Sequence, residues 1–311
     1  MSLIKKPSQL TSSATIKVLI YGQPGLGKTT IGLSAPKPVL IDFDGGARRV
    51  NGAHQVDTLQ VENWQQVIDL LASNELAPYS TIVVDTVGKM LDFMSDYLMK
   101  REPKYQQRDG SLSLKGFGAR KVAFIDFIKK ISIMGKHLVF VAHEREDKDG
   151  DKRVIRPEIG GSSLGDLIKE LDLVGYMRAN GYSREICWSG TDAFYGKNAC
   201  NLPPVMKVPA IIDEKGQITG DNNFLTGVFD SYNNYLNSQS NLRAKYDILM
   251  ERANAAIAKL DGADATNALW ESFQKVQPIW DSKIAMKSAL DAKASELGLT
   301  FNPMENKYGA A

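Results

Sequence analysis

The stretch GQPGLGKT, from Gly22 to Thr29, decides the fold of this 311-residue chain. It satisfies the pattern GxxxxGK followed by Ser or Thr, comes after an apolar run at 16–21, and opens a segment that predicts a helix. Its glycines let backbone N–H groups converge on phosphate oxygens, and a helix N-terminus favours negative charge. We therefore predict a phosphate-binding loop, in which Lys28 neutralises the β- and γ-phosphates and the Thr29 hydroxyl binds Mg²⁺.

The expected ligand of this loop is ATP with Mg²⁺, because its lysine and hydroxyl serve a nucleoside triphosphate. A chance glycine-rich loop is the alternative, but the predicted strand and helix on either side favour the phosphate loop. Nine consecutive residues are expected to contact the nucleotide: Gly22, Gln23, Pro24, Gly25, Leu26, Gly27, Lys28, Thr29 and Thr30.

Outward from the loop, apolar runs alternate with helix-like segments. Runs at 39–41, 81–85 and 137–142 predict strands, and segments at 64–73, 88–100 and 120–134 predict helices. This alternation is typical of βαβ units, so we predict an α/β fold with a mainly parallel sheet flanked by helices. After about residue 173, short apolar runs joined by turns predict an antiparallel extension of the sheet.

The domain organisation follows from shifts in composition. We predict a flexible N-terminal arm at 1–15, an ATPase core at 16–235 and a polar linker, LNSQSN, at 236–241. Residues 242–300, rich in Ala, Leu, Lys and Glu, predict a small C-terminal helical domain, and 301–311 a tail.

Overall composition names no partner, because the net charge is only +2. The two cysteines, Cys187 and Cys200, are isolated, which argues against a zinc site and fits a reducing compartment. The N-terminus lacks an apolar signal region and no run approaches the length of a membrane span. We therefore expect a cytoplasmic protein with no membrane partner.

Two apolar runs end in aspartates, and the chemistry assigns them different roles. Asp85 closes an apolar run that we expect to lie beside the strand of the phosphate loop, so it is the predicted second ligand of Mg²⁺, usually through water. Thr86 follows it in the place where many such ATPases carry a catalytic glutamate, so the base must come from elsewhere. Asp44 is the predicted base that orients the attacking water. Alternatively, Asp42 and Asp44 cap a turn before two glycines.

The phosphate loop, LIDFDGG, TIVVDT and LVFVAHE together make the chain resemble RecA-like phage ATP-binding proteins. This family includes core-only RecA relatives associated with single-strand annealing, the Sak-type group. The resemblance covers about residues 14–210 and implies a RecA-like P-loop NTPase core. It places Asp44 where RecA has its catalytic glutamate, one methylene longer, so slow hydrolysis is expected.

The resemblance also implies roles for two further residues. His143, at the end of the 137–142 strand, matches the glutamine that senses the γ-phosphate in RecA; a solvated histidine capping the strand end is the alternative. Lys197 matches the first of two lysines that act across the subunit interface on the neighbour's ATP, whereas Ala199 replaces the second. An exposed strand lysine is the alternative. A trans role for Lys197 would require self-association into a filament or ring.

Two polar segments occupy the places of the DNA-binding loops of RecA-like recombinases. The first, 100–121, has seven basic and two acidic residues, a net charge of +5, together with aromatics and glycines that suit single-stranded DNA. The second, 144–163, is mixed in charge, and ordinary solvated loops are the alternative for both. The predicted DNA contacts are Lys100, Arg101, Lys104, Tyr105, Arg108, Lys115, Phe117 and Arg120 in the first segment, and Lys148, Lys152, Arg153 and Arg156 in the second.

The predicted function is an ATPase that binds single-stranded DNA and acts in phage recombination, annealing or repair, with ATP at a subunit interface. A phage single-strand binding protein is a further expected partner. Three alternatives stay open: a helicase-loader-like or motor ATPase with the same fold, a small-molecule kinase that uses the first basic segment as a lid, and a protein in which ATP gates binding with little turnover.

Overall fold

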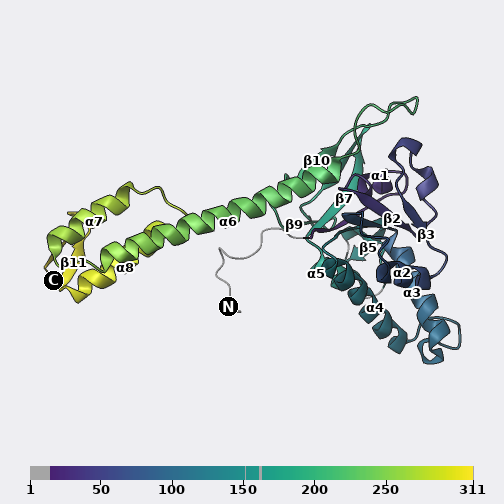
Figure 1. Cartoon of the computed structure of the whole chain (residues 1–311), viewed down its shortest axis with the longest axis horizontal. Helices are drawn as coiled ribbons and strands as arrows, with labels where there is room; N and C mark the ends of the chain where they lie inside the picture. Colours follow the sequence, from purple (N-terminus) through teal and green to yellow (C-terminus); the bar gives the residue numbers. More distant parts are fainter. Residues whose placement is uncertain (1–14, 151, 161–162, 311) are drawn as a thin grey trace. The chain divides into compact units, whose positions relative to one another are not determined.

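The computed structural model describes residues 15–150, 152–160 and 163–310, so the predicted flexible arm lies outside the described residues except for Thr15. The chain divides into two compact units, with the boundary between Asn233 and Asn234. The first unit contains the phosphate loop and is built around one large sheet (Figure 1). The predicted α/β class, with a mainly parallel sheet flanked by helices, is confirmed.

The strands run in the order β10-β8-β7-β1-β5-β4-β2-β3, and β1 lies between β7 and β5. Pairing is parallel from β7 through β1, β5, β4 and β2 to β3, whereas β8 and β10 add antiparallel strands, as the sequence predicts after residue 173. The strands are β1 (Lys17–Gly22), β2 (Pro38–Asp42), β3 (Thr58–Gln60), β4 (Thr81–Asp85), β5 (His137–Asp149), β6 (Lys152–Pro157), β7 (Leu173–Asn180), β8 (Ser183–Cys187), β9 (Lys197–Asn198) and β10 (Val205–Val208).

Helices cover both faces of this sheet, which explains why its central strands are continuous apolar runs. On β5, Leu138 and Phe140 join the core beneath four helices, α2 (Trp64–Ala72), α3 (Val87–Arg101), α4 (Leu114–Ile133) and α5 (Ser163–Glu170). On the opposite face, Val139 contacts α1 (Lys28–Gly32), and Phe229 from the start of α6 (Phe224–Ile257) packs on His137.

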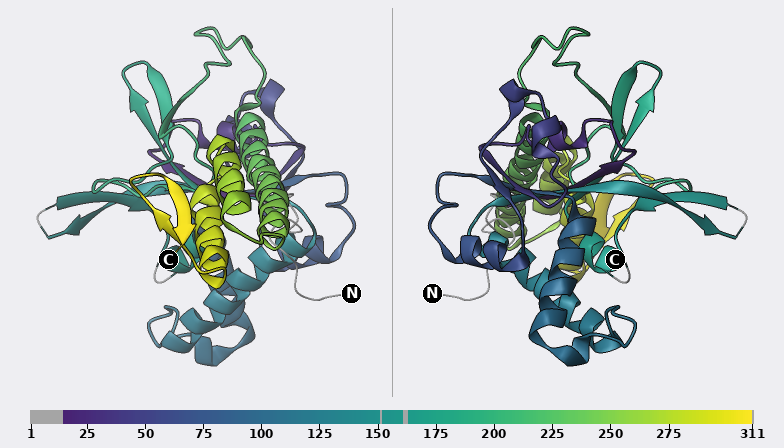
Figure 2. Two further views of the ribbon diagram at one scale, coloured as in Figure 1. Left: turned by 90° about the vertical axis from the view of Figure 1, so that its left-hand side faces the viewer. Right: turned by 90° about the vertical axis from the view of Figure 1, so that its right-hand side faces the viewer.

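Two predicted boundaries differ from the structure. The second polar segment is not a loop, because β5 continues past the sheet to Asp149 and pairs with β6 as an antiparallel hairpin (Figure 2). Helix α4 begins at Leu114, six residues before the predicted start, because the Ser113 hydroxyl accepts a hydrogen bond from the Gly116 N–H and caps it. A short 3₁₀ helix, η4 (Pro103–Tyr105), connects α3 to this region.

The second unit contains the later part of α6, α7 (Ala263–Lys275), α8 (Ser282–Glu296) and the hairpin β11 (Leu299–Asn302) with β12 (Lys307–Ala310). The predicted linker at 236–241 is helical instead, since it holds no glycine or proline that would end α6. The predicted tail pairs as a hairpin, because Tyr308 is buried against Met286 and Leu290 in this unit's core. Among the described residues, no helix is both long and apolar enough for a membrane crossing.

Candidate functional site

The loop after β1 has backbone geometry that its glycines require. A Cβ on Gly22 would lie 2.1 Å from the carbonyl oxygen of Met177 on β7, so any side chain would clash there. Gly27 has φ 88° and ψ 25°, a left-handed conformation, and caps α1 without any side-chain hydrogen bond to the helix. The first N–H groups of α1 are therefore open to an outside acceptor such as phosphate.

Lys28, Thr29 and Asp85 come together at this loop. The Thr29 hydroxyl donates a 2.6 Å hydrogen bond to Asp85 Oδ2, and Lys28 Nζ donates to the Gln23 carbonyl oxygen at 2.7 Å. Burial raises the pKa of the Asp85 carboxyl, and nearby Asp42 and Asp44 raise it further. Burial also lowers the pKa of the Lys28 ammonium, although Asp85 opposes this. Burial thus disfavours the charged form of both groups, and a bound cation at Asp85 or anion at Lys28 would favour it.

The strand that carries Asp85 is not beside the phosphate-loop strand, contrary to the sequence-based expectation. β5 lies between β1 and β4, so one strand separates the strand that leads into the loop from the strand that carries Asp85. The phosphate loop and β4 are connected by the hydrogen bond from the Thr29 hydroxyl, at the start of α1, to the Asp85 carboxylate. Because β5 fills the gap, its last sheet residue, His143, is paired with Gly22 and lies at the same edge.

The two carboxylates after β2 have separate roles. Asp42 is buried and accepts hydrogen bonds from the backbone N–H groups of Asp44, Gly46 and Ala47, at 3.1, 3.1 and 2.9 Å. It therefore caps the turn, as the alternative interpretation of this segment states. Asp44 instead lines a cavity of about 210 Å³ together with Lys28 and Asp85.

His143 and Arg49 also line this cavity, which we call the phosphate cavity. The Nδ1 atom of His143 is buried, and no described residue forms a hydrogen bond with it. Arg49 pairs with Asp44 at 3.4 Å, with 65% of the arginine side chain exposed. Sequence reasoning missed Arg49, although its place five residues after Asp44 in DGGARR was the available signal.

The oxygens of Thr29 and Asp85 are the hard donors that Mg²⁺ prefers. Within 15–150, 152–160 and 163–310, no three His, Cys, Asp or Glu side chains gather so as to hold a metal ion alone. Mg²⁺ typically keeps several waters and binds through one or two carboxylates and the substrate phosphates. The donor set therefore fits an ion that arrives with a nucleotide.

Lys197 lies in β9, where its ammonium is engaged within the chain. Its Nζ donates to the carbonyl oxygens of Ile168, at 3.0 Å, and of Leu171, at the C-terminal end of α5. Lysines are favourable there because the last carbonyls of a helix have no partners within it. This contact gives Lys197 a structural role in the monomer, and the trans role implied by the resemblance has no support from its position.

The first predicted DNA segment forms the projecting end of α3, η4 and the start of α4 (Figure 1). Within the described chain, no ion pair engages Lys100, Arg108 or Lys115, and all three are exposed. Phe117 is 43% exposed beside them. Arg101 stacks on Tyr97, and Lys104 pairs with Glu102 and lies over the Tyr105 ring. Arg120 is the exception, because it is only 7% exposed and cannot reach DNA as a surface residue does.

The second predicted DNA segment is less suited to a polyanion. Arg156 pairs with Asp147, Arg153 with Glu146 and Lys152 with Asp192, so its cations are largely neutralised by neighbouring acids. Lys148 lies on β5, opposite Arg153 in the hairpin. The balance of charge on this hairpin is therefore close to even, and it attracts phosphate weakly.

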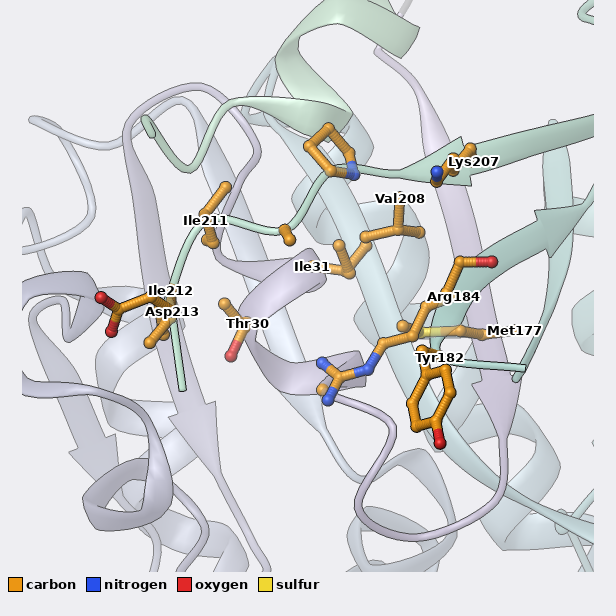
Figure 3. Close-up of a pocket in the computed structure, with 14 residues that line it drawn as sticks. Thr30, Ile31, Met177, Tyr182, Arg184, Lys207, Val208, Ile211, Ile212 and Asp213 are labelled. Carbon is orange, nitrogen blue, oxygen red and sulfur yellow. The ribbon is translucent and has the colours of Figure 1, made fainter. Parts of the chain in front are cut away.

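Two further features escaped sequence reasoning because no motif marks them. Glu144, on the opposite face of β5 from His143, interacts electrostatically with Lys28 and with Tyr176. Burial raises the pKa of Tyr176 to about 12, and Glu144 adds to the shift. A second, larger cavity of about 630 Å³ lies beside α1, with Thr30 and Ile31 in its lining (Figure 3). Gly27 and Thr30 line both this cavity and the phosphate cavity.

Comparison of the sequence with known families places the chain in one of them. The sequence model of a family described as "AAA domain" matches residues 14–200, more than half of the chain. Among solved structures, the chain is similar to the KaiC-like protein PH0186 from the hyperthermophilic archaeon Pyrococcus horikoshii OT3, with 10% identity and a TM-score of 0.35 over 56% of this chain and 78% of that one. No curated protein matches the chain.

Proposed function

The chain belongs to the AAA domain family, and from this premise we propose that it is a Mg²⁺-dependent ATPase that acts on single-stranded DNA in recombination or annealing. The observation that carries the ATPase is the 2.6 Å bond between Thr29 and Asp85, formed beside Lys28 in a cavity that Asp44 also lines. A lysine, a hydroxyl and two carboxylates in one phosphate-sized space are the parts that phosphoryl transfer requires.

Each side chain has a role in hydrolysis. Mg²⁺, when bound, neutralises charge on the β- and γ-phosphate oxygens. Lys28 releases the Gln23 carbonyl and binds the phosphates, while Thr29 and Asp85 hold the ion's position. Asp44, 25% exposed in its side chain, lies at the cavity edge, where it accepts a hydrogen bond from the attacking water and orients it. His143 donates through a ring nitrogen to the γ-phosphate.

The basic end of α3 and α4 supports the DNA part of the proposal. Lys100, Arg108 and Lys115 are exposed cations without ion pairs among the described residues, and Phe117 offers a partly exposed ring. Cations that follow a phosphate backbone and aromatic rings that stack on bases are the usual elements of single-strand binding.

A short connection joins this basic surface to the phosphate cavity. Arg120 on α4 donates to the Gly160 carbonyl oxygen at 3.4 Å, and two residues earlier the Glu158 N–H donates to the His143 carbonyl oxygen at 2.8 Å. The Arg120 guanidinium also donates to Ser95 and stacks on Phe117, but no carboxylate pairs with it in the described chain. A displacement of α4 by DNA would therefore shift the segment that holds His143, which couples DNA binding to hydrolysis.

The test is phosphate release from ATP by the full chain, measured with and without a single-stranded oligodeoxynucleotide. Wild type is expected to hydrolyse ATP faster with DNA, whereas Lys28→Ala is expected to be inactive in both conditions. Asp44→Asn should keep ATP binding and lose turnover by about 10²-fold, the scale of a misplaced catalytic group. Asp96→Asn, which removes an exposed carboxylate from α3, serves as the matched control and should hydrolyse as wild type does.

The outcomes separate the two parts of the proposal. Hydrolysis that depends on Lys28 but ignores DNA would remove the DNA part and leave the ATPase. Undiminished turnover in Asp44→Asn would remove Asp44 as the base. Unwinding of a DNA duplex coupled to ATP would favour a motor instead of an annealing protein.

A further inference from the structure

The larger cavity beside α1, which we call the flanking cavity, has no role in the chemistry described so far. Its volume of about 630 Å³ falls within the range of small-ligand pockets, which is roughly 300–1,000 Å³. Figure 3 shows its two walls: one from the β7–β8 hairpin, with Met177, Tyr182 and Arg184, and one from the segment after β10, with Ile211 and Asp213. Thr30 and Ile31 lie between them.

The flanking cavity continues the phosphate cavity along the path of a nucleotide. The phosphate cavity contains Lys28, Thr29 and Asp85, the groups that serve the terminal phosphates and Mg²⁺. Gly27 and Thr30 line both spaces, so the spaces meet where the phosphates closest to the sugar must lie. The base and sugar of a nucleotide whose terminal phosphates occupied the phosphate cavity would extend past Thr30 toward the flanking cavity.

Arg184 lies at this junction. A Cβ atom on Gly27 would be 3.0 Å from its Nη1, so the guanidinium rests directly against the phosphate loop. No carboxylate forms an ion pair with Arg184 in the part of the chain that the structure describes. An arginine without a counter-charge, held against a phosphate loop, is suited to bind a phosphate oxygen through its fork of N–H donors.

The remaining lining suits a base and a sugar. Tyr182 is fully exposed at the cavity mouth, where its ring can cover the flat face of a base. Ile31, Val208 and Ile211 supply apolar contacts. Asp213 accepts the Lys215 and Gln217 N–H groups through Oδ1, and its other oxygen is left to accept from a sugar hydroxyl or base amine.

The wall opposite the hairpin is fixed in place, so the cavity is built into the fold. Asn222 donates to the Thr30 carbonyl oxygen at 2.9 Å, and Asn51 donates to the Gly216 carbonyl oxygen at 3.2 Å. These two bonds hold this wall of the cavity, the segment after β10, against α1 and the region after β2.

We propose that the flanking cavity binds the base and sugar of a nucleotide, and that Arg184 contacts the phosphate next to the sugar within the same chain. This proposal rests on the proposed ATPase function, because it extends the same bound nucleotide. It assigns nucleoside binding to Tyr182 and phosphate positioning to Arg184, a residue that lies outside the loop motif. Inorganic tripolyphosphate has no nucleoside, so its binding should depend on Lys28 but not on Tyr182.

The test is isothermal titration of the full chain with ADP and, separately, with tripolyphosphate, both with Mg²⁺. Tyr182→Ala is expected to weaken ADP binding by about tenfold and to change tripolyphosphate binding by less than about twofold. Arg184→Ala is expected to weaken ADP binding by about tenfold or more. The control is Arg178→Ala, which removes the same charge from the same hairpin. Arg178 pairs with Glu185 and lies on the opposite face from Arg184, because it is in register with Glu185 rather than Arg184.

Each outcome decides the proposal. Unchanged ADP affinity in both Tyr182→Ala and Arg184→Ala, with wild type binding ADP, would overturn this proposal and leave the ATPase intact. If Tyr182→Ala weakened the binding of an oligodeoxynucleotide but not the binding of ADP, the ring would belong to a DNA-binding surface, and the proposal would also be overturned. Wild type that binds neither ADP nor ATP would overturn the proposed function, and this proposal with it. Thermal melts of each variant identify any loss that comes from unfolding.

Discussion

The Thr29 hydroxyl donates a 2.6 Å hydrogen bond to Asp85 Oδ2, although the strands that lead to these residues are not neighbours in the sheet. β5 separates β1 from β4, and Thr29 spans its end at the start of α1. Because β5 lies between the strands that lead to Thr29 and Asp85, its residue His143 lines the same cavity as these two side chains.

Asp85→Asn should separate stability from activity. Burial and the nearby Asp42 and Asp44 carboxylates disfavour the ionised Asp85, and asparagine removes that charge while keeping an acceptor for Thr29. The ligand-free variant should melt roughly 2–4 °C higher, which corresponds to about 1 kcal/mol for a unit of this size. Hydrolysis should fall by at least about 10²-fold. Thermal melts and phosphate release measure both; a lower melting temperature would mean that the carboxylate is held by favourable contacts.

Removing Asp42 should destabilise the protein much more than removing Asp44. Asp42→Ala leaves three backbone N–H groups near the turn without their acceptor and should lower the free energy of unfolding by about 2–4 kcal/mol. Asp44→Ala removes an ion pair whose arginine, Arg49, is 65% exposed, so its effect on stability should stay within about 1 kcal/mol. Urea unfolding of both variants makes the comparison. Equal destabilisation would contradict the separation of the two roles.

The affinity for Mg²⁺-ADP should decrease on acidification. The pKa of Asp85 is raised in the folded chain, so its ionised form costs stability at neutral pH, and that cost is relieved as pH falls through the folded pKa. Mg²⁺ binds the ionised carboxylate, so protonation should weaken metal-dependent ADP binding in the same pH range, which begins above the ordinary aspartate value. Calorimetry in a pH series tests this. In Asp85→Asn the Mg²⁺ contribution should be small and independent of pH; an unchanged pH profile there would point to another titrating group.

Lys197→Met should affect folding and leave catalysis intact. The lysine loses its bonds to the carbonyl oxygens of Ile168 and Leu171, which should cost about 1–2 kcal/mol. The rate of ATP hydrolysis per folded molecule should match wild type, and so should that of Lys215→Met, which removes an exposed loop lysine. Unfolding curves and phosphate release provide the measurements. A variant of normal stability that has lost hydrolysis would restore the role across a subunit interface.

The salt dependence of DNA binding should identify the surface. Removing Lys100, Arg108 and Lys115 together should lower the slope of log affinity against log salt by about 2, because each phosphate contact on a single strand contributes roughly 0.7. Lys152→Ala with Arg153→Ala should change the slope little, since these side chains pair with Asp192 and Glu146. Fluorescence anisotropy with a labelled oligodeoxynucleotide measures both. If the slope fell more in the Lys152→Ala, Arg153→Ala variant, the β5–β6 hairpin would be the DNA-binding surface instead.

The α/β class, the phosphate loop and most of the central strands could be predicted from the sequence alone. These features are local, because a loop pattern needs only its own glycines and neighbouring strand and helix, and buried parallel strands are continuous apolar runs. The same local character explains why Asp85 stands out, since it closes the run TIVV. The predicted linker at 236–241 was wrong because polar composition was given more weight than the absence of a glycine or proline that would end α6.

The contacts of each charged side chain could not be predicted from the sequence, because they follow from the tertiary structure. The order of the strands places β5 between the strands that lead to the two predicted ligands. The packing of the helices buries Arg120 on α4 and brings the C-terminal end of α5 to Lys197. The tertiary structure also separates two carboxylates that are two residues apart: Asp42 caps a turn, and Asp44 lines a cavity. It brings Arg184, from the β7–β8 hairpin, against Gly27. Contacts between residues far apart in the chain depend on how the strands are ordered and how helices pack on them, and neither is encoded in the spacing of nearby residues.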